Sequence, residues 1–243
     1  MGLLYAKSHR ISDDVSVLIP TVGEVLDMQE DYNRVLTAFV CTPYELMVQL
    51  DDMGIDFTQI NKYQLFFMLF RGVLEEYQNG NMAALDLVLT GCDFHHIHPA
   101  IDVDDQAFVF VDEKKHVVIN NRVYQMIRAT LCHLHDIENK EKKLFSNDDK
   151  DFFLERMRAK QRRLMRQNKQ STELEDYIVA LVNAREFKYD FDSVRGLTLY
   201  QFHRSLKQIL KRLNYDQIMQ GYYAGNLDIG KISQDTLNWL SPK

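Results

Sequence analysis

The chain has 243 residues, of which 46% are hydrophobic, and it contains only four prolines and ten glycines. A chain of this length and composition can bury about 70% of its unfolded surface in one large or two small domains. The low proline and glycine content excludes low-complexity and linker-rich proteins, so we expect order along most of the length.

The formal net charge is −6, but the charges are unevenly distributed. Residues 1–150 carry 24 acidic and 13 basic side chains, whereas residues 151–243 carry 11 acidic and 16 basic ones. We therefore expect the first part to avoid nucleic acid, and the later part either to meet an acidic partner or to balance the first part. The three cysteines, Cys41, Cys92 and Cys132, are odd in number and widely spaced, which is typical of a reducing compartment. The first ten residues lack the apolar run of a secretory signal, so we expect a cytoplasmic protein.

The first 40 residues predict a hairpin followed by a helix. Two short runs with β-branched residues, 3–11 and 15–19, are separated by Ser12-Asp13-Asp14 and predict antiparallel strands. Thr21 and Glu24 have the spacing of a capping box, and apolar residues at helical spacing follow from Val22 to Val40. We expect this helix to lie against the central part of the chain.

The rest of the molecule is expected to pack around residues 42–74. Thr42, Pro43 and Glu45 predict a helix start, and the glycine at position 54 predicts its end. A second helix is expected from about Asn61. Its centre, 65–70, has no polar face and is therefore either a central core helix or an assembly surface. It is far shorter than the roughly 20 apolar residues of a bilayer span, so we expect no membrane insertion.

The pattern from residue 79 to residue 138 predicts short strands before another helix. Residues 85–89 are a candidate strand, 91–105 a loop with its turn at Pro99, and 107–111 with 116–119 a second hairpin. Apolar residues on one face predict a helix over 121–138.

A polar stretch, 139–150, precedes the C-terminal helices and marks the predicted boundary. We expect an N-terminal helical subdomain with hairpins (1–145) and a C-terminal helical subdomain (146–243), with a single domain as the alternative. Helices are predicted over 151–167, from Thr172 and from Thr198, with a last short helix carrying Trp239. The predicted fold class is α+β, predominantly α-helical, with a helical core and one or two small β-hairpins.

Two clusters are candidates for chemistry. Cys92, His95, His96 and His98 are competent zinc ligands, but their spacing matches no known finger, and we expect a polar loop without metal. Cys132 and His133 are adjacent on a predicted helix and cannot share a face. We therefore predict no catalytic residues, no cofactor and no enzymatic activity.

A basic run between residues 156 and 169 is the one stretch suited to nucleic acid. It holds seven lysines and arginines and no acidic residue, and its basic patch comprises Arg156, Arg158, Lys160, Arg162, Arg163 and Arg166. Phosphate neutralisation would need no more than such charges. Because the whole protein is acidic, we expect a solvated or partner-facing helix rather than a nucleic-acid site.

Several blocks of the sequence carry a resemblance that spans most of the chain. They read HRISDDVSVLIPTVGEVL, YELMVQLDDMGIDF, YQLFFMLF, IVALVNAREFKYDF, LYQFHRSLKQILKRLNYDQIMQGYYAG and LNWL. In this order they resemble tail-morphogenesis proteins of tailed bacteriophages and prophages, most closely the tail assembly chaperones, although the chain is longer than the smaller chaperones.

The resemblance implies a non-enzymatic protein of the host cytoplasm that holds the tape-measure protein, the tail tube protein or both during tube polymerisation. The resemblance leaves open whether the protein forms a homo-oligomer. We expect helix-in-groove contacts, with a groove built by 65–70 and the helix over 22–40. The residues expected to bind a partner are Leu65, Phe66, Phe67, Phe70 and Trp239. The alternatives are a structural virion component (neck, tail or baseplate) and a metal- or nucleic-acid-binding accessory protein.

Overall fold

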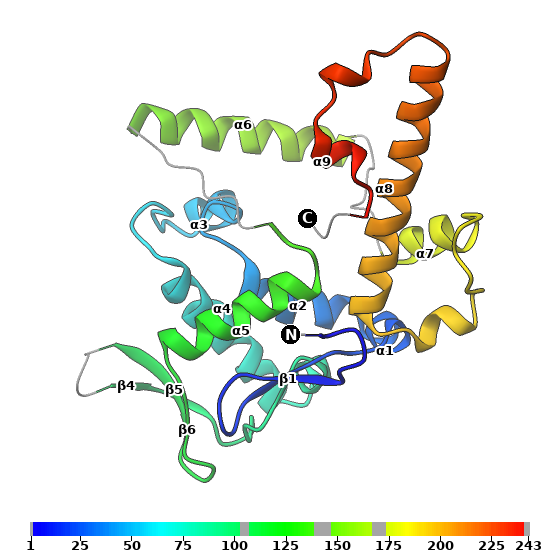
Figure 1. The fold of residues 1–243 in the computed structure, drawn as a ribbon. Helices are drawn as coiled ribbons and strands as arrows, with labels where there is room; N and C mark the ends of the chain where they lie inside the picture. Colours follow the sequence, from blue (N-terminus) through cyan, green and yellow to red (C-terminus); the bar gives the residue numbers. More distant parts are fainter. Residues whose placement is uncertain (1, 103–106, 139–146, 167–173, 241–243) are drawn as a thin grey trace.

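A computed structural model describes residues 2–102, 107–138, 147–166 and 174–240. The fold is 56% helical with two three-stranded antiparallel sheets, which confirms the predicted α+β, predominantly helical class (Figure 1). Among these residues, no helix combines the length and the apolar character that crossing a bilayer requires.

The predicted N-terminal hairpin is present as β1 (Ser8–Arg10) and β2 (Ser16–Leu18). A third strand, β3 (Leu89–Thr90), pairs with β2. The predicted strand over 85–89 is wrong for most of its length, because the 3₁₀ helix η1 (Ala83–Leu87) occupies it. Gly91, just after β3, has φ +106°, and a Cβ there would lie 1.6 Å from the Asp14 carbonyl oxygen. Only glycine allows this close approach.

The predicted helix over 22–40 is divided into α1 (Val22–Asp27) and α2 (Gln29–Val40), with the break at Met28. The capping box of Thr21 and Glu24 is formed. Thr42 and Glu45 also form their box, but the chain turns for several residues before α3 (Met47–Asp52) begins.

The central apolar stretch lies in α4 (Lys62–Gln78), which begins with a capping box between Asn61 and Gln64. Phe66 and Phe70 are fully buried, and both pack against Phe39 of α2 and Phe110 of the second sheet. Of the two interpretations, the structure therefore shows a core helix.

The second sheet has the strand order β4 (His98–Ile101), β5 (Phe108–Asp112), β6 (Val117–Ile119). The hairpin of β5 and β6 was predicted, and α5 (Asn121–Leu134) follows it as expected. The predicted turn at Pro99 is wrong, because Pro99 pairs with Phe110 inside β4. Since β4 is an edge strand, a proline without an N–H fits there.

Helix α6 (Asn147–Arg166) packs on α3 apart from the main core. A second hydrophobic cluster joins Leu154 of α6 to Met47, Val48, Leu50, Phe57 and Leu65. This cluster fixes one face of α6 and leaves the opposite face to solvent.

The chain then forms α7 (Leu174–Val182), η2 (Ser193–Gly196), α8 (Leu199–Tyr223), η3 (Ile229–Lys231) and α9 (Gln234–Leu237). The start of α8 is bound to the start of α1, because Val22 N donates to Leu197 O and Leu199 N to Pro20 O, both at 2.8 Å. The main core holds side chains from both sides of residue 146, including Phe202. The predicted division at this residue stays a prediction.

Candidate functional site

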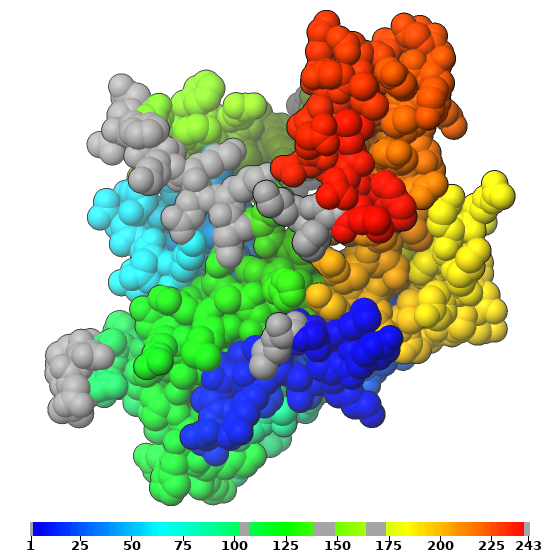
Figure 2. Space-filling model, in the orientation of Figure 1, coloured from blue at the N-terminus to red at the C-terminus, as the bar shows by residue number. Residues whose placement is uncertain are grey.

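The second half of α8 leaves the body and forms, with η3 and α9, a C-terminal arm that we define as residues 210–240. Figure 1 shows α8 running away from the other helices, and Figure 2 shows the same segment, in orange and red, standing out from the molecule. Phe202 is the last buried side chain among the described residues, and every later one is at least partly exposed. The arm therefore has no core of its own.

Contacts within the arm hold α9 against α8. The Arg212 guanidinium lies 4.7 Å from the centre of the Trp239 ring, and Gln208 Nε2 donates to the Trp239 carbonyl oxygen at 2.9 Å. Gly221 lies so close to Leu227 that a Cβ would approach its Cδ1 to 2.6 Å. Trp239, expected to bind a partner, is thus half-buried against its own chain, directly after α9 rather than within it.

Apolar side chains on the other side of α8 lack such cover. Leu206, Leu210 and Leu213 lie at positions i, i+4 and i+7 and so share one face of the helix, which we call the leucine stripe. Leu206 still packs against the main core, whereas Leu210 is 56% and Leu213 39% exposed. The stripe thus continues the core-facing side of α8 beyond the end of the core. Contiguous exposed apolar surface of this kind is typical of a binding site.

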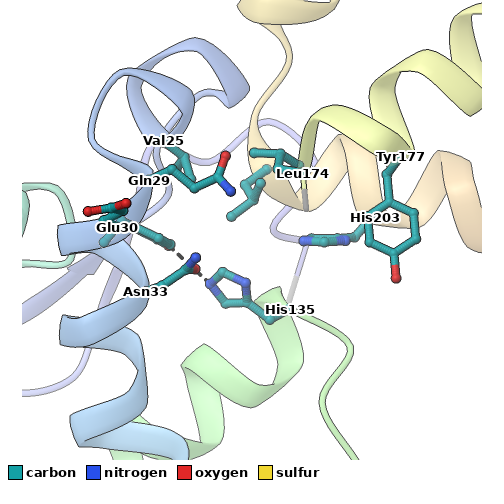
Figure 3. Close-up of a pocket in the computed structure, with 10 residues that line it drawn as sticks. Val25, Gln29, Glu30, Asn33, His135, Leu174, Tyr177 and His203 are labelled. Atoms are coloured by element: carbon teal, nitrogen blue, oxygen red, sulfur yellow. Dashed lines mark hydrogen bonds between the residues drawn. The ribbon is translucent and has the colours of Figure 1, made fainter. Parts of the chain in front are cut away.

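A pocket of about 250 Å³ lies at the base of α8, where the body meets α7 (Figure 3). It is lined by Val25, Gln29, Glu30, Tyr32, Asn33, His135, Leu174, Tyr177, Leu199 and His203. His135 follows the end of α5, and its ring lies 5.6 Å, centre to centre, from that of His203 on α8. The Tyr32 hydroxyl of α2 lies 3.0 Å from His135 Nε2.

Burial sets the protonation of these groups. It lowers the pKa of His135 to about 3, with a smaller contribution from His203, and it also lowers the pKa of His203, against the nearby Asp136. Burial raises the pKa of Tyr32. Both imidazoles are therefore neutral at pH 7, and the Tyr32 hydroxyl can donate to His135 Nε2. General acid–base catalysis favours a pKa near the working pH, and His135 is far below it. The arrangement is suited to holding α8 on the body.

An ion pair reinforces the same junction. Lys207 Nζ of α8 lies 2.6 Å from the Asp136 carboxylate, next to His135 in the sequence. Together with the bridge between Thr21 and Thr198, this contact fixes the direction in which α8 leaves the body. The arm is consequently mounted on a well-anchored base.

Residues 166–242 match the family model of the YomV second domain. This family is associated with Bacillus prophages, in agreement with the phage link expected from the sequence. No curated protein and no solved structure matches the chain. The YomV segment holds α7, α8, the arm and one wall of the pocket, whereas Tyr32 and His135 on the facing wall lie outside it. The match covers about a third of the chain.

The structure places the other residues expected to bind a partner in the body, away from the YomV segment. Leu65, Phe66 and Phe70 are buried, and Phe67 is half-buried with its ring 4.9 Å from Phe108 and 4.6 Å from Phe110. The folded chain presents none of the three buried side chains to a partner. The sequence predicted the helix from Thr198 that carries Leu206 and Leu213, but nothing in it indicated where along this helix the contact with the body would end.

The cluster of Cys92 and the three histidines forms contacts within the protein. Burial raises the pKa of the Cys92 thiol to about 12. The two ring nitrogens of His96 lie 2.8 Å from an Asp93 carboxylate oxygen and 2.7 Å from Lys114 Nζ. His95 stacks at a tilt against Tyr77, 5.0 Å between ring centres. Within the described ranges, no three His, Cys, Asp or Glu side chains are arranged to hold a metal ion.

The predicted basic patch divides between two faces of α6. Arg158 contacts Asp51 at 2.7 Å and Asp52 at 2.6 Å and so fastens the helix to α3. The side chains of Arg156, Lys160 and Arg163 are exposed on the other side, and Arg162, one turn after Arg158, is exposed beside it. The side chain of Arg166 lies outside the described ones.

Proposed function

We propose that this protein is a non-enzymatic phage tail morphogenesis protein, a tail assembly chaperone that holds the tape-measure protein while the tail tube polymerises. The observation that carries the proposal is the leucine stripe on an arm that lies within a segment matching a prophage-associated family. The working site is then the host cytoplasm, where tails are assembled.

The physical requirements of such a chaperone agree with this surface. A tape-measure protein is a long amphipathic helical chain whose apolar faces need cover until the tube encloses them. Helices recognise each other through apolar anchors at i, i+3, i+4 and i+7, the spacing of Leu206, Leu210 and Leu213. Burying exposed leucines of this size contributes roughly 1.5–3 kcal/mol each. The stripe replaces the groove of residues 65–70 that the sequence predicted.

The chemistry of the pocket supports a role without catalysis. Tyr32 and His135 titrate far from neutrality in opposite directions, so the pair is not matched to proton transfer near pH 7. Its hydrogen bond joins α2 to the chain after α5, beneath α8. We therefore assign the pocket to the mounting of the arm.

Co-expression with the tape-measure protein of the same prophage tests the proposal. We expect the wild-type chain to keep the tape-measure protein soluble and to co-purify with it. The double variant Leu210→Ser/Leu213→Ser should lose at least about tenfold in recovered complex, since each lost anchor costs more than 1 kcal/mol. The matched control is Ile101→Ser/Val118→Ser, which removes two exposed apolar side chains from the second sheet and should leave recovery unchanged.

Two outcomes would count against the proposal. Equal loss of complex in both double variants would mean that general surface hydrophobicity, rather than the stripe, holds the tape-measure protein. Mass spectrometry of purified particles addresses the alternative: a chaperone is missing from finished virions, and stoichiometric recovery of this chain from them would make it a structural virion component.

A further inference from the structure

Helix α6 uses one face to bind the body. Leu154 is buried in the second hydrophobic cluster, and Phe153 and Met157 pack beside it. The cations on this side are neutralised, because Arg158 contacts two carboxylates of α3 and Lys150 Nζ lies 2.8 Å from Asp56. The acidic residues of the body nearest to α6 are therefore already paired.

The opposite face carries an unbroken line of cations. Arg156, Lys160 and Arg163 lie at positions i, i+4 and i+7 and are all exposed, and Phe152, 59% exposed, lies one turn earlier on the same line. No ion pair joins these three cations to the residues that the structure describes. We call Phe152, Arg156, Lys160 and Arg163 the α6 outer stripe.

We propose that the α6 outer stripe binds the phosphate backbone of a single-stranded nucleic acid. From Arg156 to Arg163 the helix rises about 10 Å at 1.5 Å per residue, so the three cations form a line along which the phosphates of one strand can lie. Phosphate neutralisation requires only positive charge and carries no sequence information. Phe152 adds the aromatic face on which an unpaired base stacks.

The composition of the stripe favours nucleic acid over an acidic protein. The centre of a protein interface is depleted of charged residues and relies on apolar anchors. Between Arg156 and Arg163 the outer face offers only the methyl group of Ala159 for that purpose. The body carboxylates Asp51, Asp52 and Asp56 are paired with cations of α6. Asp151 and Glu155 are exposed near the start of the stripe, but from residue 156 to residue 163 the helix carries no acidic residue.

Fluorescence anisotropy on the full chain tests the proposal with a labelled 20-nucleotide oligothymidine. Arg156→Ala/Lys160→Ala/Arg163→Ala should weaken binding at least about tenfold at roughly 50 mM salt and reduce the slope of log K against log salt by about 2. The control Arg122→Ala/Arg185→Ala/Lys188→Ala removes three other exposed cations and should change the affinity by less than about twofold. Circular dichroism should give both variants the wild-type helix content.

Further binding measurements identify the class of ligand. Phe152→Ala should weaken binding of the single strand by about fivefold or more, since stacking contributes roughly 1–3 kcal/mol per base, and leave binding of a duplex unchanged. Single-stranded RNA and DNA should bind alike. The proposal is overturned if the wild type shows no binding at about 10⁻⁴ M, the weak limit of non-specific affinity. Tighter binding of the duplex, equal loss in the control variant, or preferential binding of polyglutamate would overturn it as well.

Discussion

His135 and His203 face each other where α8 leaves the body, and burial determines what each imidazole can do. The pKa of His135 is lowered to about 3, so this residue stays neutral over the pH range in which a free histidine titrates, and burial lowers the pKa of His203 as well. A neutral His135 can accept a hydrogen bond from the Tyr32 hydroxyl, 3.0 Å from its Nε2, without a charge to solvate. The junction is consequently stable at neutral pH and sensitive to acid.

The pH dependence of stability tests this assignment at the level of one residue. A histidine whose folded pKa is lowered contributes stability that is full above its unfolded pKa of about 6.5 and is lost as the pH falls toward the folded value. Between pH 7 and pH 5 we expect the free energy of unfolding to fall by about 2 kcal/mol on account of His135. Urea unfolding of the wild type and of His135→Gln measures it, and the variant should lack this part of the decrease. Identical decreases in both proteins would show that His135 is not protonated on unfolding.

Single residues were predictable where their partners are near in the sequence. The capping boxes of Thr21, Thr42 and Thr198 each join residues three apart, and all three are formed as such spacing indicates. The contact of His135 with His203 joins two helices separated by α6 and α7, and no local pattern indicates it. The pocket was therefore out of reach of sequence reasoning, although the segment over 22–40 that supplies Val25 and the four lining residues on α2 was predicted to be helical.

At the scale of elements, α8 owes its orientation to its first turn. Thr198 accepts a hydrogen bond from the Gln201 N–H, and its backbone pairs with Thr21 at the start of α1. We expect Thr198→Ala to lower the free energy of unfolding by about 1 kcal/mol, the usual cost of losing a capping hydroxyl. Thr198→Ser keeps that hydroxyl and should cost less than half as much. Thermal unfolding with circular dichroism gives both values, and a neutral Thr198→Ala would mean that the box contributes nothing.

The predicted element boundaries were wrong where tertiary contacts override the local preference of the sequence. Pro99 indicated a turn, but the edge position of β4 tolerates a residue without an N–H, and the proline pairs with Phe110. No glycine or proline lies at Met28 to indicate the break between α1 and α2. Residues 85–87 have strand-like composition yet form η1, which packs against α2. Helices were readable from periodicity and the hairpins β1–β2 and β5–β6 from their apolar runs, whereas the strands β3 and β4 were not predicted as such.

At the scale of the whole molecule, the leucine stripe and the α6 outer stripe lie on different helices. The main core takes in the first half of the chain and the base of α8, and the described apolar surface of α8 beyond it lies on the arm. Exposed cations gather on the outer face of α6. If both proposals hold, the chain brings a helical protein partner and a nucleic acid together on two separate surfaces.

Hydrogen–deuterium exchange of the intact chain, with and without the tape-measure protein, tests the central claim most directly. Amides of an unsupported helix exchange readily, and burial against a partner slows them. We expect added tape-measure protein to slow exchange in the part of α8 that belongs to the arm, over residues 210–223, while α4 in the core is unaffected. Unchanged exchange over these residues, with protection confined to other parts of the chain, would contradict the assignment of the arm as the partner-binding element.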